Sequence, residues 1–146
     1  MKFKLFIDQN CEEEVICNVH ARTALVDELE RLVTQDASKD HLTGYLEDEI
    51  KILPLNEIEC FFVEDEKTFA SYENGKKYLV KKRLYELEEM LPSDFVRINK
   101  SAIANSKKIS KFKVNLSGAV DARFESGYTD YVSRRCFADL KRRFDL

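Results

Sequence analysis

Basic and hydrogen-bonding side chains gather in one stretch of the chain, SDFVRINKSAIANSKKISKF (residues 93–112). Its five cations face a single acid, Asp94; they are Arg97, Lys100, Lys107, Lys108 and Lys111. Arginine and lysine donate paired hydrogen bonds to guanine, asparagine pairs with adenine, and serine binds phosphate. These residue types suit duplex DNA, and they suit RNA or an acidic protein less specifically.

The charged residues are predicted to lie on short loops, which a rigid β scaffold can direct into a groove. The candidate DNA contacts on these loops are Lys67, Thr68, Arg97, Asn99, Lys100, Ser101, Lys107, Lys108, Ser133, Arg134 and Arg135. Structural alternatives stay open for some of them. Arg97 could pair with an acid across strands, and Ser101 could cap local backbone groups. Asn105 ends a predicted strand and is expected to satisfy backbone groups, as asparagine does in turns.

The distribution of charge supports a polyanionic partner. The net charge is −11 over residues 1–74 and +8 over residues 75–146, which together make the −3 of the whole chain. Such an asymmetry between halves is a hint of polyanion binding by the basic part, although basic residues also coat ordinary solvated faces.

Catalytic and metal-binding patterns are missing from the sequence. It has no GxSxG, no HExxH and no glycine-rich phosphate loop, and its four cysteines form no CxxC pair. Cys136 lies next to two arginines, but core packing is the favoured role for this thiol. We therefore expect no enzyme, no cofactor, no metal and no small-molecule substrate. Without a signal-peptide layout or a long apolar run, we expect a cytoplasmic protein.

Two parts of the chain differ in character. Residues 2–8 alternate as strands do, residues 13–21 are predicted to form another strand, and residues 23–36 have the apolar spacing of a helix with Thr23 as N-cap. The polar stretch 37–44 marks a boundary. The sequence predicts a small acidic β/α segment at 1–42 and a larger domain at 43–146.

The larger domain is predicted to be mainly β. Its expected elements are strands around an acidic turn at 47–49, a strand at 58–65, a hairpin turned at Asn74-Gly75, a helix at 83–91 closed by Pro92, further short strands, a hairpin turned at Ser126-Gly127 and a last helix at 134–144.

The segment FVRINKSAIANSKKI (95–109), followed by YVSRRCFADLK (131–141), resembles the LytTR DNA-binding domain of bacterial transcriptional regulators. The shared pattern is an aromatic residue, Arg, an apolar residue, two polar positions, Ser, and an apolar–x–Asn ending. The upstream apolar segment, strand pair and short helix also fit, so the resemblance covers about residues 43–146.

The resemblance implies an α+β domain of short antiparallel strands with two short helices. Such domains bind repeat promoter sites through loops in successive major grooves. It implies base contacts at Lys100 and at Arg134, and a third contact from the loop with Lys67 and Thr68. In that loop this chain has Phe69 at the position where members of the family can have a polar side chain that contacts a base. The third contact therefore departs from the family pattern.

The N-terminal segment is too short for the phospho-acceptor receiver domain of many such regulators. We expect it to be a dimerisation element, a docking site for a membrane-bound regulatory partner, or a strand and helix that complete the core. Two functions follow. The first is a cytoplasmic, homodimeric, sequence-specific regulator of transcription that binds double-stranded DNA. The second is a non-enzymatic protein-interaction or titration module acting through the acidic N-terminal surface.

Overall fold

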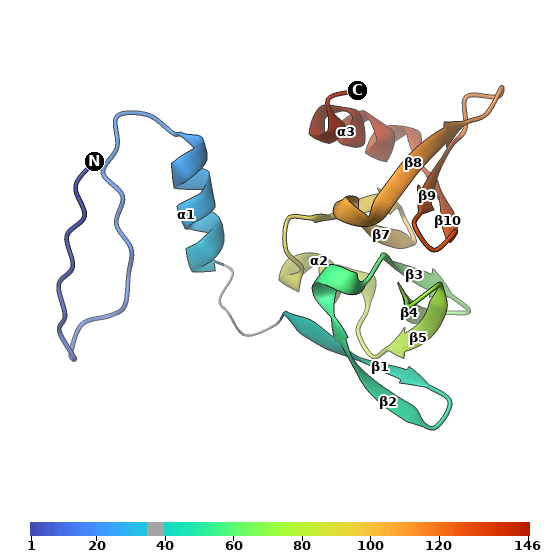
Figure 1. Ribbon diagram of the computed structural model, residues 1–146, viewed down its shortest axis with the longest axis horizontal. Coiled ribbons are helices and arrows are strands. Elements are labelled where there is room, and N and C mark those ends of the chain that lie inside the picture. The colour runs from blue at the N-terminus through green and yellow to red at the C-terminus, as the bar shows by residue number, and fades with distance from the viewer. Residues whose placement is uncertain (35–39) are drawn as a thin grey trace. The chain divides into compact units, whose positions relative to one another are not determined.

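A computed structural model describes residues 1–34 and 40–146 of the chain, which divides into two compact units, Met1–Ser38 and Lys39–Leu146 (Figure 1). The predicted domain starts at residue 43, whereas the first strand of the second unit, β1, begins at His41. None of the helices in the described residues is long and apolar enough to cross a bilayer.

Within residues 1–34 the first unit forms one helix, α1 (Ala24–Thr34), which confirms the predicted helix as far as residue 34. Residues 35 and 36, the end of that prediction, lie outside the described residues. The predicted N-cap is confirmed, because Thr23 Oγ1 accepts a hydrogen bond from the backbone N–H of Val26 at 3.4 Å.

The strands predicted at 2–8 and 13–21 are wrong, because no strand forms in residues 1–22. The two segments are joined by a turn in which Cys11 donates its backbone N–H to the Asp8 carbonyl at 3.4 Å. An alternating segment becomes a strand only where a neighbour completes its hydrogen-bond ladder. Their apolar side chains stay exposed instead; Phe3 and Ile7 are 89% and 87% exposed.

The second unit is built on two antiparallel sheets. The larger has seven strands in the order β2-β1-β5-β4-β3-β7-β6; they are β1 (His41–Leu46), β2 (Glu49–Pro54), β3 (Cys60–Glu64), β4 (Lys67–Tyr72), β5 (Lys76–Val80), β6 (Phe95–Asn99) and β7 (Ala102–Asn105). The smaller has the order β10-β9-β8; its strands are β8 (Ile109–Val114), β9 (Val120–Phe124) and β10 (Thr129–Val132). The fold class predicted from the sequence is confirmed.

Short helices connect and cover these strands. The α-helices are α2 (Leu84–Met90) and α3 (Arg134–Phe144), and the 3₁₀ turns are η1 (Leu55–Glu57) and η2 (Ser106–Lys108). Both α-helices match the predicted ones to within a residue. The hairpin turns at Asn74-Gly75 and Ser126-Gly127 are also confirmed, as each lies between two paired strands.

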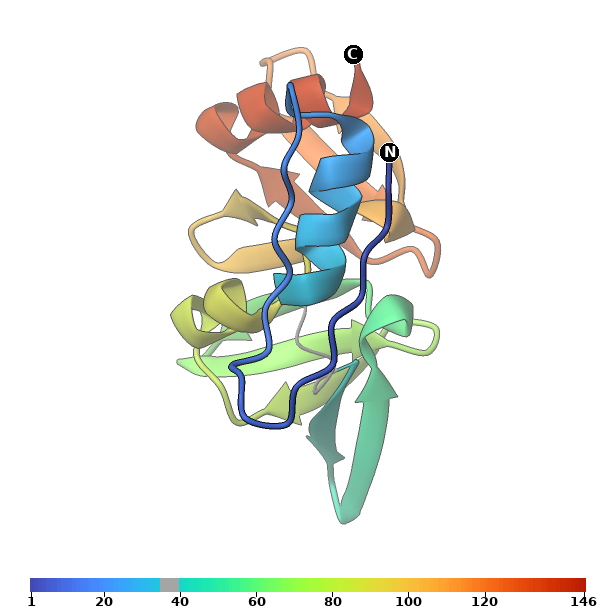
Figure 2. The ribbon, with the colours of Figure 1, turned by 90° about the vertical axis from the view of Figure 1, so that its left-hand side faces the viewer.

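Two apolar clusters hold the second unit together. The first joins α2 to strands β1 to β5 and includes Leu53, Phe61 and Leu87, none of which is exposed. The second joins β6 and β7 to the smaller sheet and α3, with Ile98, Ala122 and Leu140 at its centre. The smaller sheet and α3 therefore form one end of the unit, and the β1–β2 hairpin projects at the other (Figure 2).

Candidate nucleic-acid interface

Lys100 stands on a two-residue turn between β6 and β7, and its side chain is exposed. Backbone contacts hold this turn from several sides. Arg97 Nη1 donates to the Lys100 carbonyl at 3.0 Å, and Val63 donates its N–H to the Ser101 carbonyl at 2.9 Å. The Lys100 side chain therefore projects from a fixed backbone.

Arg97 and Asn99 lie in strand β6, so their predicted position on a loop is wrong. The Arg97 side chain faces α2. Its guanidinium donates to both carboxylate oxygens of Glu88, at 3.2 Å from Nε and 2.9 Å from Nη2. This fork leaves the Arg97 side chain 29% exposed. The acid that Arg97 pairs with is thus on a helix, not on a neighbouring strand.

Asn99 is buried, with 1% of its surface exposed, and its amide joins the two sheets. Oδ1 accepts the backbone N–H of Ser101 at 2.8 Å. Nδ2 donates to the Tyr131 carbonyl at 2.8 Å and to Asp130 Oδ1 at 3.2 Å. Asn99 therefore fixes the Lys100 turn against strand β10.

The start of α3 lies beside the same turn, because Ser133 donates its backbone N–H to the Ile98 carbonyl at 2.8 Å. Ser133 is also the N-cap of α3, and its Oγ accepts the N–H of Cys136 at 3.2 Å. Arg134 and Arg135 then form the first helical positions, and both are exposed. Lys100 and Arg134 are thus brought to one edge of the unit.

Two arginines at a helix N-terminus are unfavourable, because the helix dipole is positive there and favours acids. The first turn of α3 contains no acidic residue. Within residues 1–34 and 40–146, no hydrogen bond or ion pair engages the side chains of Lys100, Arg134 or Arg135. These cations are available to an anion from outside the chain.

The structure places Lys67 and Thr68 in strand β4, so their predicted position on a loop is wrong. Only Asp65 and Glu66 form the turn, both with positive φ, of 51° and 62°. Lys67 is exposed, whereas Thr68 is 7% exposed. Strand β3 pairs with β7 up to the Lys100 turn, and Lys67 lies opposite Glu64 at the end of β3. Lys67 and Lys100 are therefore at the same end of the sheet's strands.

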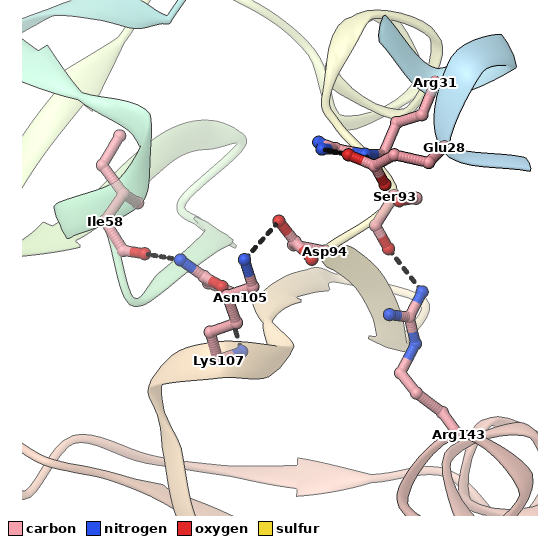
Figure 3. A network of polar contacts seen from close by, with 8 residues as sticks. All are labelled: Glu28, Arg31, Ile58, Ser93, Asp94, Asn105, Lys107 and Arg143. Carbon is pink, nitrogen blue, oxygen red and sulfur yellow. Dashed lines mark hydrogen bonds and ion pairs between the residues drawn. The ribbon is translucent and has the colours of Figure 1, made fainter. Parts of the chain in front are cut away.

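Lys107 and Lys108 lie in η2, at the opposite end of β7 from Lys100. Asn105 caps this turn by accepting the Lys107 N–H at 3.1 Å and donates Nδ2 to the Ile58 carbonyl at 3.0 Å (Figure 3). The expectation that Asn105 satisfies backbone groups is confirmed. Lys107 Nζ lies 3.4 Å from Asp94, with the lysine side chain 74% exposed. Strand β7 lies between Lys100 and the two lysines of η2, and its four residues span about 13 Å.

A partly buried polar cluster, formed by Asp130, Tyr128 and Cys60, lies behind the Lys100 turn. Burial raises the pKa of Asp130, although hydrogen bonds from Tyr128, the Tyr131 N–H and Asn99 oppose the rise. Burial also raises the pKa of the Tyr128 hydroxyl and of the Cys60 thiol well above their ordinary values. Tyr128 and Cys60 are therefore neutral at physiological pH.

Several residues at this edge escaped the sequence prediction. Strand β5 ends beside Thr68 and runs into the basic segment 81–83, where Arg83 is exposed and Lys81 Nζ lies 4.3 Å from the centre of the Tyr45 ring. The run of three cations is visible in the sequence and is the signal that could have identified it. Glu88 and Asp130 have no such signal, because their roles depend on contacts made in the fold.

Comparison with known proteins places these features in a family. A family model described as the LytTr DNA-binding domain matches residues 48–145. Uncharacterized HTH-type transcriptional regulators of Staphylococcus aureus strains NCTC 8325 and COL are each 34% identical over 149 residues, covering 100% of this chain and 99% of the relative. The corresponding protein of strain MW2 is 33% identical over the same span.

A solved structure has a similar fold. The LytTr DNA-binding domain of a methyl-accepting/DNA response regulator from Bacillus cereus superimposes with a TM-score of 0.67 at 22% identity, covering 75% of this chain and all of that domain. In the described residues strands separate α1, α2 and α3, so the relatives' HTH label does not describe the fold of this part of the chain. The family model covers two thirds of the chain, and the chain therefore belongs to the LytTR family, which is defined by its DNA-binding domain.

Proposed function

We propose that this protein is a sequence-specific transcriptional regulator that reads repeat promoter sites in double-stranded DNA. Lys100 and Arg134 contact base edges in the major groove, where either can donate to guanine. The observation that carries the proposal is that both side chains are exposed and find no partner among the residues that the structure describes, while the backbone beneath them is held by Arg97, Asn99 and Ser133.

The other predicted contacts divide by exposure. Lys67, Lys107, Lys108 and Arg135 serve as phosphate contacts, and Ser101 and Ser133 lie beside the base-reading residues. Arg97, Asn99 and Thr68 orient the surface from within, since Asn99 and Thr68 are buried and Arg97 is engaged by Glu88. The chain acts by binding alone, in the bacterial cytoplasm, without catalysis.

The first unit serves dimerisation or regulation. None of the residues of α1 is buried, and Leu25 and Leu32 are 50% and 59% exposed. An apolar helix face of this kind requires a partner. We assign that partner to a second copy of the chain, with a membrane-bound regulatory protein as the second candidate. Leu32→Asp is expected to convert a dimer to a monomer in sedimentation, whereas exposed Thr34→Asp leaves the dimer intact.

The same exposed face favours a second candidate function, a protein-interaction or titration module acting through the first unit. The two functions differ in their need for Lys100 and Arg134. A regulator loses its activity when either is replaced, whereas an interaction module retains its partner.

The experiment begins with selection of bound sites from a pool of random duplexes. Binding of wild type, Lys100→Ala and Arg134→Ala to a selected and a scrambled duplex is then titrated with salt. Each substitution is expected to remove about 1–3 kcal/mol of the preference for the selected duplex. Lys76→Ala, at the start of β5, and Arg142→Ala, at the far end of α3, are matched controls that retain it. Equal binding of both duplexes by wild type contradicts the proposal.

A further inference from the structure

Asp130 links the two base-reading elements. Its Oδ1 accepts from Asn99 Nδ2 at 3.2 Å and from the Tyr131 backbone N–H at 2.8 Å, and its Oδ2 accepts from the Tyr128 hydroxyl at 3.0 Å. All three donors belong to different residues, so the carboxylate is held in a fixed orientation.

Short contacts continue from Asp130 to both reading residues. On one side Asn99 accepts the N–H of Ser101, which follows Lys100. On the other side the chain runs from Tyr131 to Ser133, the residue directly before Arg134. The backbone N–H of Ser133 donates to the Ile98 carbonyl. The carboxylate therefore lies at the junction of the two backbone segments that carry Lys100 and Arg134.

The third donor is anchored by aromatic packing. The Tyr128 ring lies 5.2 Å from Phe62 in the larger sheet and 5.6 Å from Phe124 in the smaller one, measured between ring centres. Such packing restricts the ring, and with it the direction in which the hydroxyl donates. Asp130 is thus fixed both to the Lys100 side of the junction and to the interior of the domain.

We propose that Asp130 is a positioning residue that sets the separation of Lys100 and Arg134 and thereby the spacing of the two bases they read. This inference rests on the proposed function. A polar group withdrawn from solvent costs free energy unless its partners are complete; here the bond from Asn99 joins the two segments that carry the reading residues, while the bonds from Tyr128 and Tyr131 hold the half-buried carboxylate in place.

Asparagine at position 130 can reproduce these contacts. Its Oδ1 can accept from Asn99 and Tyr131, and its amide can donate to the Tyr128 hydroxyl, which also accepts. Alanine provides none of these atoms. The pair Asp130→Ala and Asp130→Asn therefore separates loss of the junction from loss of the charge, and Glu125→Ala, exposed in the β9–β10 turn, removes a carboxylate from the same hairpin.

The test uses the full chain and a duplex selected by wild type, in which the positions relaxed by Lys100→Ala and by Arg134→Ala have been mapped. Binding is measured to this duplex, to a scrambled one, and to one with a base pair inserted between the mapped positions. For folded Asp130→Ala we expect at least about a fivefold loss of preference for the selected duplex, equal affinity for the scrambled one, and a smaller penalty for the insertion. Asp130→Asn and Glu125→Ala are expected to behave as wild type.

The insertion penalty distinguishes positioning from a merely structural role, which would lower affinity for all duplexes together. An unchanged preference and insertion penalty in folded Asp130→Ala overturns the inference, as does a uniform loss on all three duplexes. If Asp130→Ala does not fold, Tyr128→Phe removes one donor and keeps the ring, and an unchanged insertion penalty in that variant overturns the inference. If wild type selects no duplex, the proposed function itself is refuted and the inference falls with it.

Discussion

Substitution of Arg97 by lysine tests whether this residue contacts DNA or supports the Lys100 turn. Lysine keeps the positive charge, so a phosphate contact would survive. It cannot reproduce the two bonds to Glu88 together with the bond to the Lys100 carbonyl. The substitution therefore removes support for the turn without changing the charge of the surface.

The expected magnitude follows from exposure. The Glu88 side chain is 48% exposed, so solvent screens the ion pair and it contributes at most about 1 kcal/mol. The bond to the Lys100 carbonyl adds about 1 kcal/mol. We expect Arg97→Lys to lower the free energy of unfolding by about 1–2 kcal/mol, which corresponds to a Tm decrease of roughly 4–16 °C for a domain of this size.

The assay combines urea unfolding with the preference for a selected over a scrambled duplex. Arg97→Lys is expected to lower both stability and preference, with an unchanged salt slope. The control Glu88→Gln leaves the bond to Lys100 in place and is expected to retain the preference. The reasoning is refuted if Arg97→Lys behaves as wild type while Arg97→Ala lowers the salt slope by about one, because that result identifies a direct phosphate contact.

Three further predictions concern the frame around the site. Ser133→Ala removes the N-cap of α3 and is expected to cost about 1 kcal/mol in urea unfolding; Ser133→Asp is expected to restore stability but weaken DNA binding, and equal DNA binding by both variants would contradict this. Gly44→Ala places a Cβ 2.6 Å from Leu53 Cδ1 and 2.8 Å from Tyr78 Cβ, so a loss of about 1–3 kcal/mol is expected, and an unchanged unfolding midpoint would show that the strands shift freely. The raised pKa of Asp130 means that the folded state binds its proton more tightly, so this group's contribution to stability is fully present below pH 3.8, the ordinary value, and is lost as pH rises from there through the folded pKa; Asp130→Asn is expected to remove this part of the pH profile of unfolding, and parallel wild-type and variant profiles would contradict it.

Local chemistry made much of the second unit predictable. The Asn74-Gly75 turn, Pro92 after α2 and the apolar spacing of α3 each indicate an element that the structure contains. The exact position of the turn at Asp65-Glu66 could not be predicted, because Asp65 tolerates the positive φ that both residues adopt but Glu66 does not favour it. Tertiary pairing of β3 with β4 outweighs the local preference there, and the misplaced loop at Lys67 follows from it.

The candidate site was predictable in its exposed residues and not in its buried ones. Lys100 and Arg134 stand out by residue type and by the pattern around them. The role of Asn99 depends on Asp130 and Tyr131, about thirty residues later in the chain, and on burial that no local spacing reveals. The strands expected at 2–8 and 13–21 failed for the opposite reason, because a local strand pattern is present but no strand in the part of the chain that the structure describes pairs with it.

The separation between side chains that face outward and those that hold the turn has a consequence for how such a domain can diversify. Lys100 contributes its backbone to the frame and its side chain to nothing inside the described residues. Its side chain can therefore be exchanged with little effect on folding, and the same turn can present a different hydrogen-bonding pattern to a base. Recognition is thus free to change one exposed position at a time, while buried Asn99 and half-buried Asp130 keep the geometry in which any new side chain is presented.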